Sequence, residues 1–327
     1  MSRQRAVKLD TASHSKIRLG ISSCLMGQRV RYDGNHQYDG FITGTLGKFF
    51  EFVPVCPEVA IGLGTPRPPI RLVGSAAAPR AVGIDDTALD VTDKLAAFGN
   101  RMAHELIGIS GYIFKSKSPS CGMERVKVYH RGGMPARHGR GIYAAAFLVA
   151  RPGLPAEEEG RLNDPRLRDN FIERVFSYRR WQAVVAAGPT AALLVEFHTR
   201  HKLALLAHGA DTYRQFGRLL AQARRKGPNG LADEYIRRFM DALAHPATPA
   251  RHANVMMHLM GYLKKGLDAA DKAELLELIR GYRAGEAPLA APVTLLRHHF
   301  RLCPHPYVAR QTYLYPDPRE LLLRGGF

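Results

Sequence analysis

The stretch SPSCG at residues 118–122 places Cys121 just after an apolar, strand-like run at 111–114 and a short basic segment. Proline and glycine allow the backbone to turn tightly there. Two earlier stretches share this layout, in which a strand-like run leads to a cysteine: IRLGI at 17–21 before Cys24, and FVPV at 52–55 before Cys56. In an open α/β sheet, the loops at the carboxyl ends of the strands line the ligand crevice. Three such loops, each with one cysteine, could therefore bring three thiolates to one point.

Residues 16–151 alternate between short apolar runs and segments of helical period, which is typical of an α/β domain. The expected strands are the runs at 17–21, 52–55, 111–115, 125–129 and 142–149. A helix is expected at about 92–107, because apolar side chains recur there at helical spacing. The segment 71–90 is rich in alanine, glycine and proline, and we interpret it as a loop.

The rest of the chain is expected to be helical. Residues 1–152 are assigned to the α/β domain and 153–185 to a connector. The connector contains turn residues, the acidic run EEE at 157–159, and a helix capped by Asp164 with Pro165 at its first position. From 186 to 327 apolar stripes at helical spacing are separated by prolines, which predicts an all-α domain.

The composition bounds the function. A chain of 327 residues with 46% hydrophobic residues is long enough for two packed domains. The net charge of +18 favours a polyanionic partner, with nucleic acid as the first candidate and an anionic membrane surface as the second. A surface that is basic only for solubility is the alternative. No apolar run approaches the length of a transmembrane helix. We expect a cytoplasmic protein without membrane association or an obligate protein partner.

The four cysteines are too few and too far apart for a disulfide framework, which fits a reducing compartment. Cys24, Cys56 and Cys121 are separated by 32 and 65 residues, unlike the close pairs of a zinc ribbon or the cysteine run of a ferredoxin. Three unrelated cysteines would also fit this spacing, but each lies beside glycine, proline or serine at a strand end. Three thiolates suit a [4Fe–4S] cluster whose fourth iron stays open as a Lewis acid for a soft ligand such as sulfur. Cys303 is interpreted as an ordinary cysteine in a turn.

The three cysteine blocks, together with RYDG at 31–34 and PRPP at 66–69, resemble the pattern of the thiouracil desulfidases. The resemblance implies a Rossmann-like domain that holds a [4Fe–4S] cluster on Cys24, Cys56 and Cys121. It also implies a reaction in which the thiocarbonyl sulfur of a pyrimidine is replaced by oxygen. The sequence departs from the pattern around 73–90.

The remaining chain resembles the YbgA-type helical domain, through FHTRHK at 197–202 and NVMMHLMGYLKK at 254–265 among other stretches. Proteins with both parts resemble the group that acts on 4-thiouridine in tRNA. The resemblance therefore implies conversion of 4-thiouridine to uridine with release of sulfide, in a hydrolysis without net electron transfer.

Four residues beside the cysteines are candidates for the chemistry. Glu58 is expected to transfer a proton to or from water or substrate, although a carboxylate at a helix N-terminus can serve the helix dipole alone. Ser118 is expected to hydrogen-bond the ring or relay a proton, with turn formation as the alternative. Ser23 and Ser120, which precede Cys24 and Cys121, are assigned to substrate binding.

The helical part carries a dense set of basic residues that we expect to follow the phosphates of tRNA. The candidates are Lys202, Arg214, Arg218, Lys264, Lys265 and Arg297, with a further basic run at 224–226. A solvated face without a partner is the alternative. Two other functions stay open: a desulfidase of free thiobases such as 2-thiouracil, and a non-catalytic nucleic-acid-binding protein whose cluster senses redox state.

Overall fold

The computed structural model describes residues 15–130, 134–221 and 228–324. The chain divides into two compact units, one ending at Phe171 and the other beginning at Ile172. The division falls inside helix α4 (Pro165–Ala186), within the segment expected to connect two domains. Asp164 accepts hydrogen bonds from the backbone amides of Arg166 and Leu167, as expected of a helix cap. The basic run at 224–226 lies outside the described residues.

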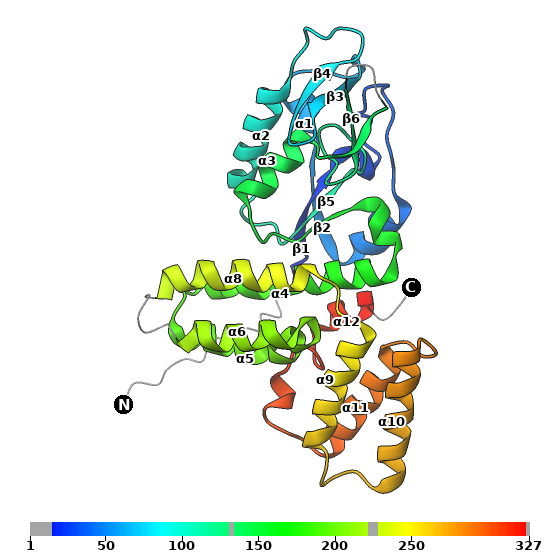
Figure 1. Cartoon of the computed structure of the whole chain (residues 1–327), viewed down its shortest axis with the longest axis vertical. Helices are drawn as coiled ribbons and strands as arrows, with labels where there is room; N and C mark the ends of the chain where they lie inside the picture. Colours follow the sequence, from blue (N-terminus) through cyan, green and yellow to red (C-terminus); the bar gives the residue numbers. More distant parts are fainter. Residues whose placement is uncertain (1–14, 131–133, 222–227, 325–327) are drawn as a thin grey trace. The chain divides into compact units, whose positions relative to one another are not determined.

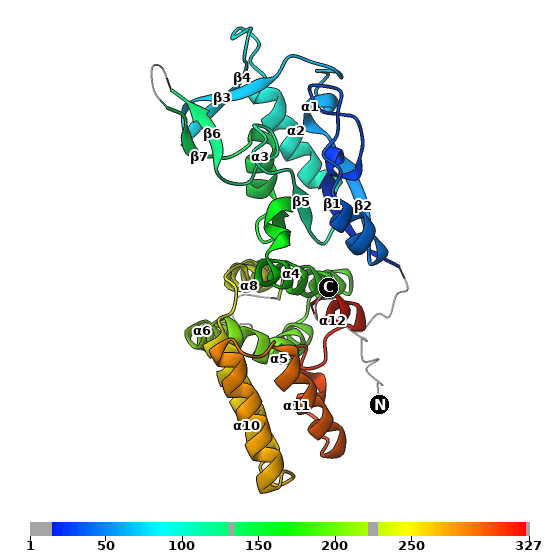
Figure 2. The same cartoon turned by 90° about the vertical axis from the view of Figure 1, so that its right-hand side faces the viewer.

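The first unit is built around a four-stranded parallel sheet in the order β2-β1-β5-β8. Figure 2 labels the first three of these strands. Its strands are β1 (Ile17–Ser22), β2 (Phe50–Val55), β5 (Tyr112–Phe114) and β8 (Ala156–Glu158). From β1 the sheet continues to β2 on one side and to β5 on the other. This reversal of strand order creates a crevice at the carboxyl ends of β1 and β5. The acidic run at 157–159 thus begins in a strand, and the sheet extends past residue 152.

A second, mixed sheet has the order β4-β3-β6-β7. Its strands are β3 (Ile70–Ser75), β4 (Ala78–Gly83), β6 (Val126–Tyr129) and β7 (Ala136–Gly139). The loop expected at 71–90 was wrong, because β3 and β4 form an antiparallel hairpin there. Leu72 and Ala81 are fully buried, so the small residues of this segment pack as part of a sheet. Pro79 fits because β4 is an edge strand, where a missing amide is tolerated.

Three helices accompany these sheets: α1 (Pro57–Ala60), α2 (Thr92–Glu105) and α3 (Ile142–Ala150). Helix α2 confirms the expected helix, but the strand expected at 142–149 was wrong. An apolar run of this length fits a buried strand or a buried helix equally well, and its three consecutive alanines favour helix. Helices α2 and α3 lie side by side (Figure 1). They approach closely at Gly99, where a Cβ atom would meet the carbonyl oxygen of Tyr143 at 2.7 Å.

Short helical turns complete the first unit. They are η1 (Ser23–Met26), η2 (Phe41–Thr45), η3 (Leu46–Lys48) and η4 (Glu159–Asn163). Together the elements form a mixed α/β unit with a parallel sheet, and the sequence expectation is confirmed at that level.

The second unit is helical, as expected. Besides the end of α4 it contains α5 (Ala191–His208), α6 (Ala210–Ala221), α8 (Pro228–Ala244), α9 (Pro249–Tyr262), α10 (Ala269–Ala284), α11 (Ala290–Leu302), η5 (Val308–Arg310) and α12 (Pro318–Arg324). One apolar core surrounds Trp181 and Phe197, and a second surrounds Leu259 and Leu296. Helices α9, α10 and α11 lie side by side around the second core (Figure 1). Within the described residues, no helix is both long and apolar enough to cross a bilayer.

A group of charged side chains is buried in this helical unit. Glu173 of α4 lies 3.4 Å from Nε2 of His208 and 3.5 Å from the guanidinium of Arg324. Arg180 donates to Glu320 at 2.6 Å, so α12 is joined to α4 by a second ion pair. Burial alone would raise the pKa of Glu173, but Arg324 and the hydrogen bond from His208 outweigh it and hold the pKa well below its usual range. These pairs bind the last helix to the unit.

Candidate active site

Cys24, Cys56 and Cys121 line a single cavity of about 430 Å³ at the carboxyl ends of the parallel strands. Cys24 lies in η1 directly after β1, and Cys56 follows β2 as the residue that precedes α1. Cys121 belongs to the loop after β5 and is buried, whereas the other two are half-buried. The parallel sheet thus brings together three cysteines that are far apart in the sequence.

Burial dominates the electrostatics of the three thiols. It raises the pKa of Cys24 to about 11, with the neighbouring Cys56 as the next contribution. Burial also raises the pKa of Cys56 and of Cys121. Cys303 does not line this cavity; it lies in the helical unit, with its thiol 3.8 Å from the carbonyl oxygen of Gly266. In the described part of the chain, no three His, Cys, Asp or Glu residues form a group that could hold a metal ion.

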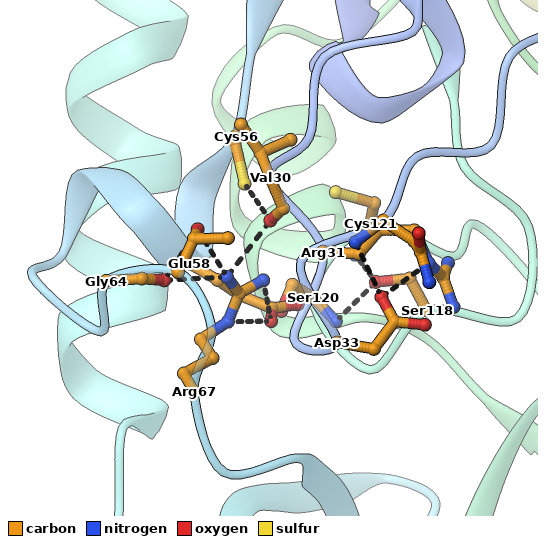
Figure 3. Close-up of polar contacts among 12 residues, drawn as sticks. Val30, Arg31, Asp33, Cys56, Glu58, Gly64, Arg67, Ser118, Ser120 and Cys121 are labelled. Atoms are coloured by element: carbon orange, nitrogen blue, oxygen red, sulfur yellow. Dashed lines mark hydrogen bonds and ion pairs between the residues drawn. The ribbon is translucent and has the colours of Figure 1, made fainter.

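Glu58 also lines the cavity, and both of its carboxylate oxygens are engaged (Figure 3). Ser120 donates its hydroxyl hydrogen to Oε1 at 2.6 Å. Arg67 donates to Oε2 from Nε at 2.9 Å and from Nη2 at 2.7 Å. The Arg67 side chain is only 3% exposed, and its Nη1 donates to the carbonyl oxygens of Val30 and Gly64. The carboxylate is therefore fixed in orientation, since three donors hold it.

The predicted serines occupy different positions. Ser118 and Ser23 line the cavity, whereas Ser120 is fully buried and is absent from its lining. Ser118 Oγ accepts hydrogen bonds from the amides of Ser120 at 3.2 Å and Cys121 at 3.1 Å. It thus forms the turn that was the alternative to a catalytic role, while its hydroxyl hydrogen is not used in these two bonds, and its contact with a substrate stays a prediction. Ser120 instead orients Glu58, and its contact with a substrate stays a prediction.

The acidic run at 157–159, which begins in β8 beside β5, fixes the Cys121 loop at both ends. Before the cysteine, Glu159 forms a short contact with the ammonium of Lys115 and accepts from the amide of Ser116 at 2.6 Å. After the cysteine, Glu158 accepts from the amide of Met123 at 2.7 Å. Sequence reasoning assigned this run to a connector and missed both contacts, because they join residues about 35 to 44 positions apart.

Helix α3 supports the same loop from the other side. The amides of Gly141, Ile142 and Ala144 donate to the carbonyl oxygens of Gly122, Pro119 and Ser120 at 2.7, 3.0 and 3.1 Å. A Cβ atom on Gly141 would lie 2.5 Å from the Ser120 carbonyl group, so this close approach requires glycine. The unpaired amides at the start of the helix are satisfied by the loop that carries Cys121.

The basic residues predicted to bind nucleic acid lie on several segments of the helical unit. Lys202 is half-buried on α5, and Arg218 is exposed on α6. Arg214 is also on α6, where it pairs with Asp211 at 3.0 Å. Lys264 and Lys265 are exposed just after α9. Arg297 of α11 lies with its guanidinium carbon 5.7 Å from the ring centroid of Tyr315.

An α/β unit with three cysteines in one cavity, followed by a helical unit, is matched by two families. Residues 19–159 match the family described as 2-thiouracil desulfurase, and residues 202–318 match a protein family of unknown function, DUF1722. The first half of the chain thus matches the model of the 2-thiouracil desulfurase family, and the chain belongs to the YbgA family, through a relative that is 33% identical.

The relatives each cover half of this chain or slightly less. The uncharacterized protein YbgA of Escherichia coli (strain K12) is 33% identical over 164 residues, which cover 50% of this chain and 97% of that protein. The uncharacterized protein YbbK of Bacillus subtilis (strain 168) is 28% identical over 158 residues, 44% of this chain and 97% of that protein. A solved structure of the [4Fe–4S]-dependent thiouracil desulfidase TudS is 33% identical, covering 46% of this chain and 95% of that chain, with a TM-score of 0.36.

Proposed function

We propose that this protein is a [4Fe–4S]-dependent desulfidase that converts 4-thiouridine in tRNA to uridine and releases sulfide. The observation that carries the proposal is the single cavity lined by Cys24, Cys56 and Cys121, in a part of the chain that matches the 2-thiouracil desulfurase family model. The solved relative that is 33% identical is described as a [4Fe–4S]-dependent thiouracil desulfidase. The helical unit and the net charge of +18 favour a polyanionic form of the thiopyrimidine.

The donor set fits such a cluster. Cysteine thiolates are the usual ligands of [4Fe–4S] clusters, and each binds a different iron, so they lie farther apart than the ligands of one metal ion. Three loops that each present one thiol to the same cavity meet this requirement without forming a site for a single ion. When bound, the cluster would supply an iron without a cysteine ligand, which acts as a Lewis acid toward the thiocarbonyl sulfur.

The residues of the chain would orient the substrate and move protons. Glu58 is held by Arg67 and Ser120 at the wall of the cavity, where its carboxylate can accept a proton from the attacking water. Ser118, whose oxygen already accepts two amide hydrogens, has its hydroxyl hydrogen available for the ring. Water adds to the carbon of the C=S group, the carbon–sulfur bond breaks, and hydrosulfide leaves with a proton, so no net electron is required.

A concave surface on α11 supports the nucleic-acid part of the proposal. It has a volume of about 530 Å³ and is lined by Thr294, Arg297, His298, Arg301 and Tyr315. Within the part of the chain that the structure describes, its lining contains two arginines one helical turn apart and no acidic side chain. Arginine contacts to phosphates fix the register of a nucleic acid, and an aromatic ring can stack on an unpaired base.

A second candidate function is the desulfidation of free thiobases, which the description of the matched family favours. The deciding experiment is anaerobic reconstitution of the cluster, followed by incubation with thiolated tRNA, 4-thiouracil or 2-thiouracil in parallel. We expect loss of 4-thiouridine from digested tRNA with an equal amount of sulfide. Conversion of the free bases alone would favour the second candidate, and sulfide from none of the three would contradict both.

A further inference from the structure

The cysteine cavity is rich in positive charge. Among the described residues, Glu58 is the one acidic side chain that lines it. Four cationic side chains line it as well: Arg31, Arg67, Lys115 and Lys117. Arg67 is bound to Glu58, and Lys115 is bound to Glu159 behind the cavity wall. Arg31 lies 3.6 Å from Asp33. Lys117 alone among the four has no ion pair with a described carboxylate, and it is exposed.

The backbone of Lys117 is also unusual. Its φ angle is 60°, in the left-handed region that non-glycine residues seldom adopt. Glycine would adopt this conformation without the steric penalty of a Cβ atom. The loop thus places a long cationic side chain, at an unfavourable backbone position, three residues before the buried Ser120 and four before Cys121.

The walls of the cavity suit a planar ring next to this charge. Tyr32, Pro69, Ile70 and Ile84 contribute apolar surface to the lining, and Tyr32 and Ile84 are themselves partly exposed. A pyrimidine against such surface would leave its ribose and phosphate toward the exposed side. A phosphate is a strong partner for an ammonium group that has no carboxylate.

We propose that Lys117 binds a phosphate that flanks the reacting nucleoside, so that the cavity itself recognises a nucleotide and not a free base. The inference rests on the proposed function for the identity of the base, but the phosphate site is defined by Lys117 and the cavity lining. It makes the α/β unit, and not only the helical unit, responsible for selecting nucleotides.

The test compares Lys117→Gly with Arg125→Gly in the full chain with its cluster. Arg125 is a matched control because it also has a positive φ angle, 55°, and an exposed cationic side chain, but it does not line the cavity. Both variants lose one charge and gain glycine at a left-handed position, so both should keep or slightly raise the melting temperature. The probes are uridine and its 5′- and 3′-monophosphates, which contain no sulfur and are not consumed, and binding is measured by calorimetry.

We expect at least one monophosphate to bind roughly tenfold or more tightly than uridine, as a charge-assisted hydrogen bond would give. Lys117→Gly should remove this preference and Arg125→Gly should retain it. The two monophosphates distinguish which flanking phosphate is bound. Equal binding of all three probes to the unmodified chain, including no binding, would overturn the proposal, as would a preference that persists in Lys117→Gly. Sulfide release from thiolated tRNA, measured separately, reports on the proposed reaction and not on this site.

Discussion

In the α/β unit, the carboxylates of the half-buried Glu58 and Glu159 and the buried Glu158 hold loops. In the helical unit, the buried carboxylates of Glu173 and Glu320 hold helices. Each of the first three contacts a loop that contains a cysteine or lies beside one. Glu173 and Glu320 instead pair with arginines from neighbouring helices, and neither of them lines the cysteine cavity. Carboxylates therefore position the loops of the candidate site in the α/β unit, whereas in the helical unit they hold helices together. Substitutions in the first set should reduce iron retention or activity, whereas substitutions in the second set should reduce the stability of the helical unit.

The largest expected effect is loss of the cluster. Cys121→Ala should abolish iron binding and sulfide release, because the remaining two thiols cannot hold a [4Fe–4S] cluster in the same way. Cys303→Ala is the control, since this cysteine belongs to the helical unit and does not line the cavity. Iron content and visible absorbance after anaerobic reconstitution provide the measurement. Full iron content in Cys121→Ala would contradict the assignment of that ligand.

The second largest expected effect is a loss of catalysis in a variant that keeps its iron. Glu58→Ala should keep the cluster absorbance and lower the rate of sulfide release by about 10²–10⁴-fold, the usual contribution of a positioned acid or base. Arg67→Ala leaves the carboxylate present but removes the donors that orient it, so we expect a smaller decrease in rate. Single-turnover kinetics on thiolated tRNA measure both. An unchanged rate in Glu58→Ala would remove this residue from the mechanism.

The difference between carboxylates that hold loops and carboxylates that hold helices is tested most directly by comparing Glu159→Gln with Glu173→Gln. Glu173→Gln removes one of the two buried carboxylates that pair with Arg324, the other being Glu320. The cost should therefore fall below the about 3–5 kcal/mol of a buried charge that is left with no partner. Trp181, the one tryptophan of the chain, lies in the core of the helical unit, so its fluorescence reports unfolding there. We expect its urea midpoint to fall in Glu173→Gln and to stay unchanged in Glu159→Gln.

Glu159→Gln should instead reduce retention of iron, because it releases Lys115 and Ser116 from the loop before Cys121. If both variants shifted the Trp181 midpoint equally, the distinction between loop-holding and helix-holding carboxylates would fail.

A smaller effect is expected when the pH is lowered, which should reduce the stability of the helical unit. Burial lowers the pKa of His198 to about 4 and of His201 to about 3, compared with about 6.5 in an unfolded chain. As the pH falls below about 6.5, the unfolded state binds protons that the folded state does not, so the free energy of unfolding decreases. The loss is on the order of 2 kcal/mol per histidine near pH 5.

The Trp181 urea midpoint at pH 7.5 and pH 5 checks this prediction. His198→Gln should reduce the pH dependence, whereas His258→Gln, at an exposed position on α9, should leave it as it is. A urea midpoint that does not change with pH would contradict the prediction that the buried His198 and His201 are neutral in the folded state.

The smallest effect concerns the surface on α11. The double change Arg297→Ala with Arg301→Ala should weaken tRNA binding at low salt and lower the salt slope of the association constant by about 1 to 2. Arg280→Ala is the control, because this arginine lies in a concave region with Glu274, Glu277 and Glu286. An effect of the control about half as large as that of the double variant, in proportion to the charges removed, would mean that these arginines act only through the net charge of the protein.

The sequence predicted the parts of this fold that depend on local pattern. The cysteines after β1, β2 and β5 were found because a strand-like run followed by a tight turn is a short-range signal. The hairpin of β3 and β4 was missed because its alanines, glycines and proline look like a loop unless the partner strand is known. Helix α3 was missed because an apolar run without polar positions has no readable period.

The electrostatic supports of the site were beyond the reach of the sequence. The pair of Arg67 with Glu58 joins residues 9 apart, and the pair of Lys115 with Glu159 joins residues 44 apart. Nothing in the spacing of these residues selects one partner over another. Only the order of the parallel strands brings the end of β8 next to the loop after β5.

Strand β8 has a practical consequence for anyone who wishes to express the part of the chain with the cysteine cavity as a separate fragment. A polypeptide ending at residue 152 would lack β8 together with Glu158 and Glu159, so the loop around Cys121 would have neither of its carboxylate anchors. The minimal piece should continue through η4, to Asn163, before a stop codon is introduced.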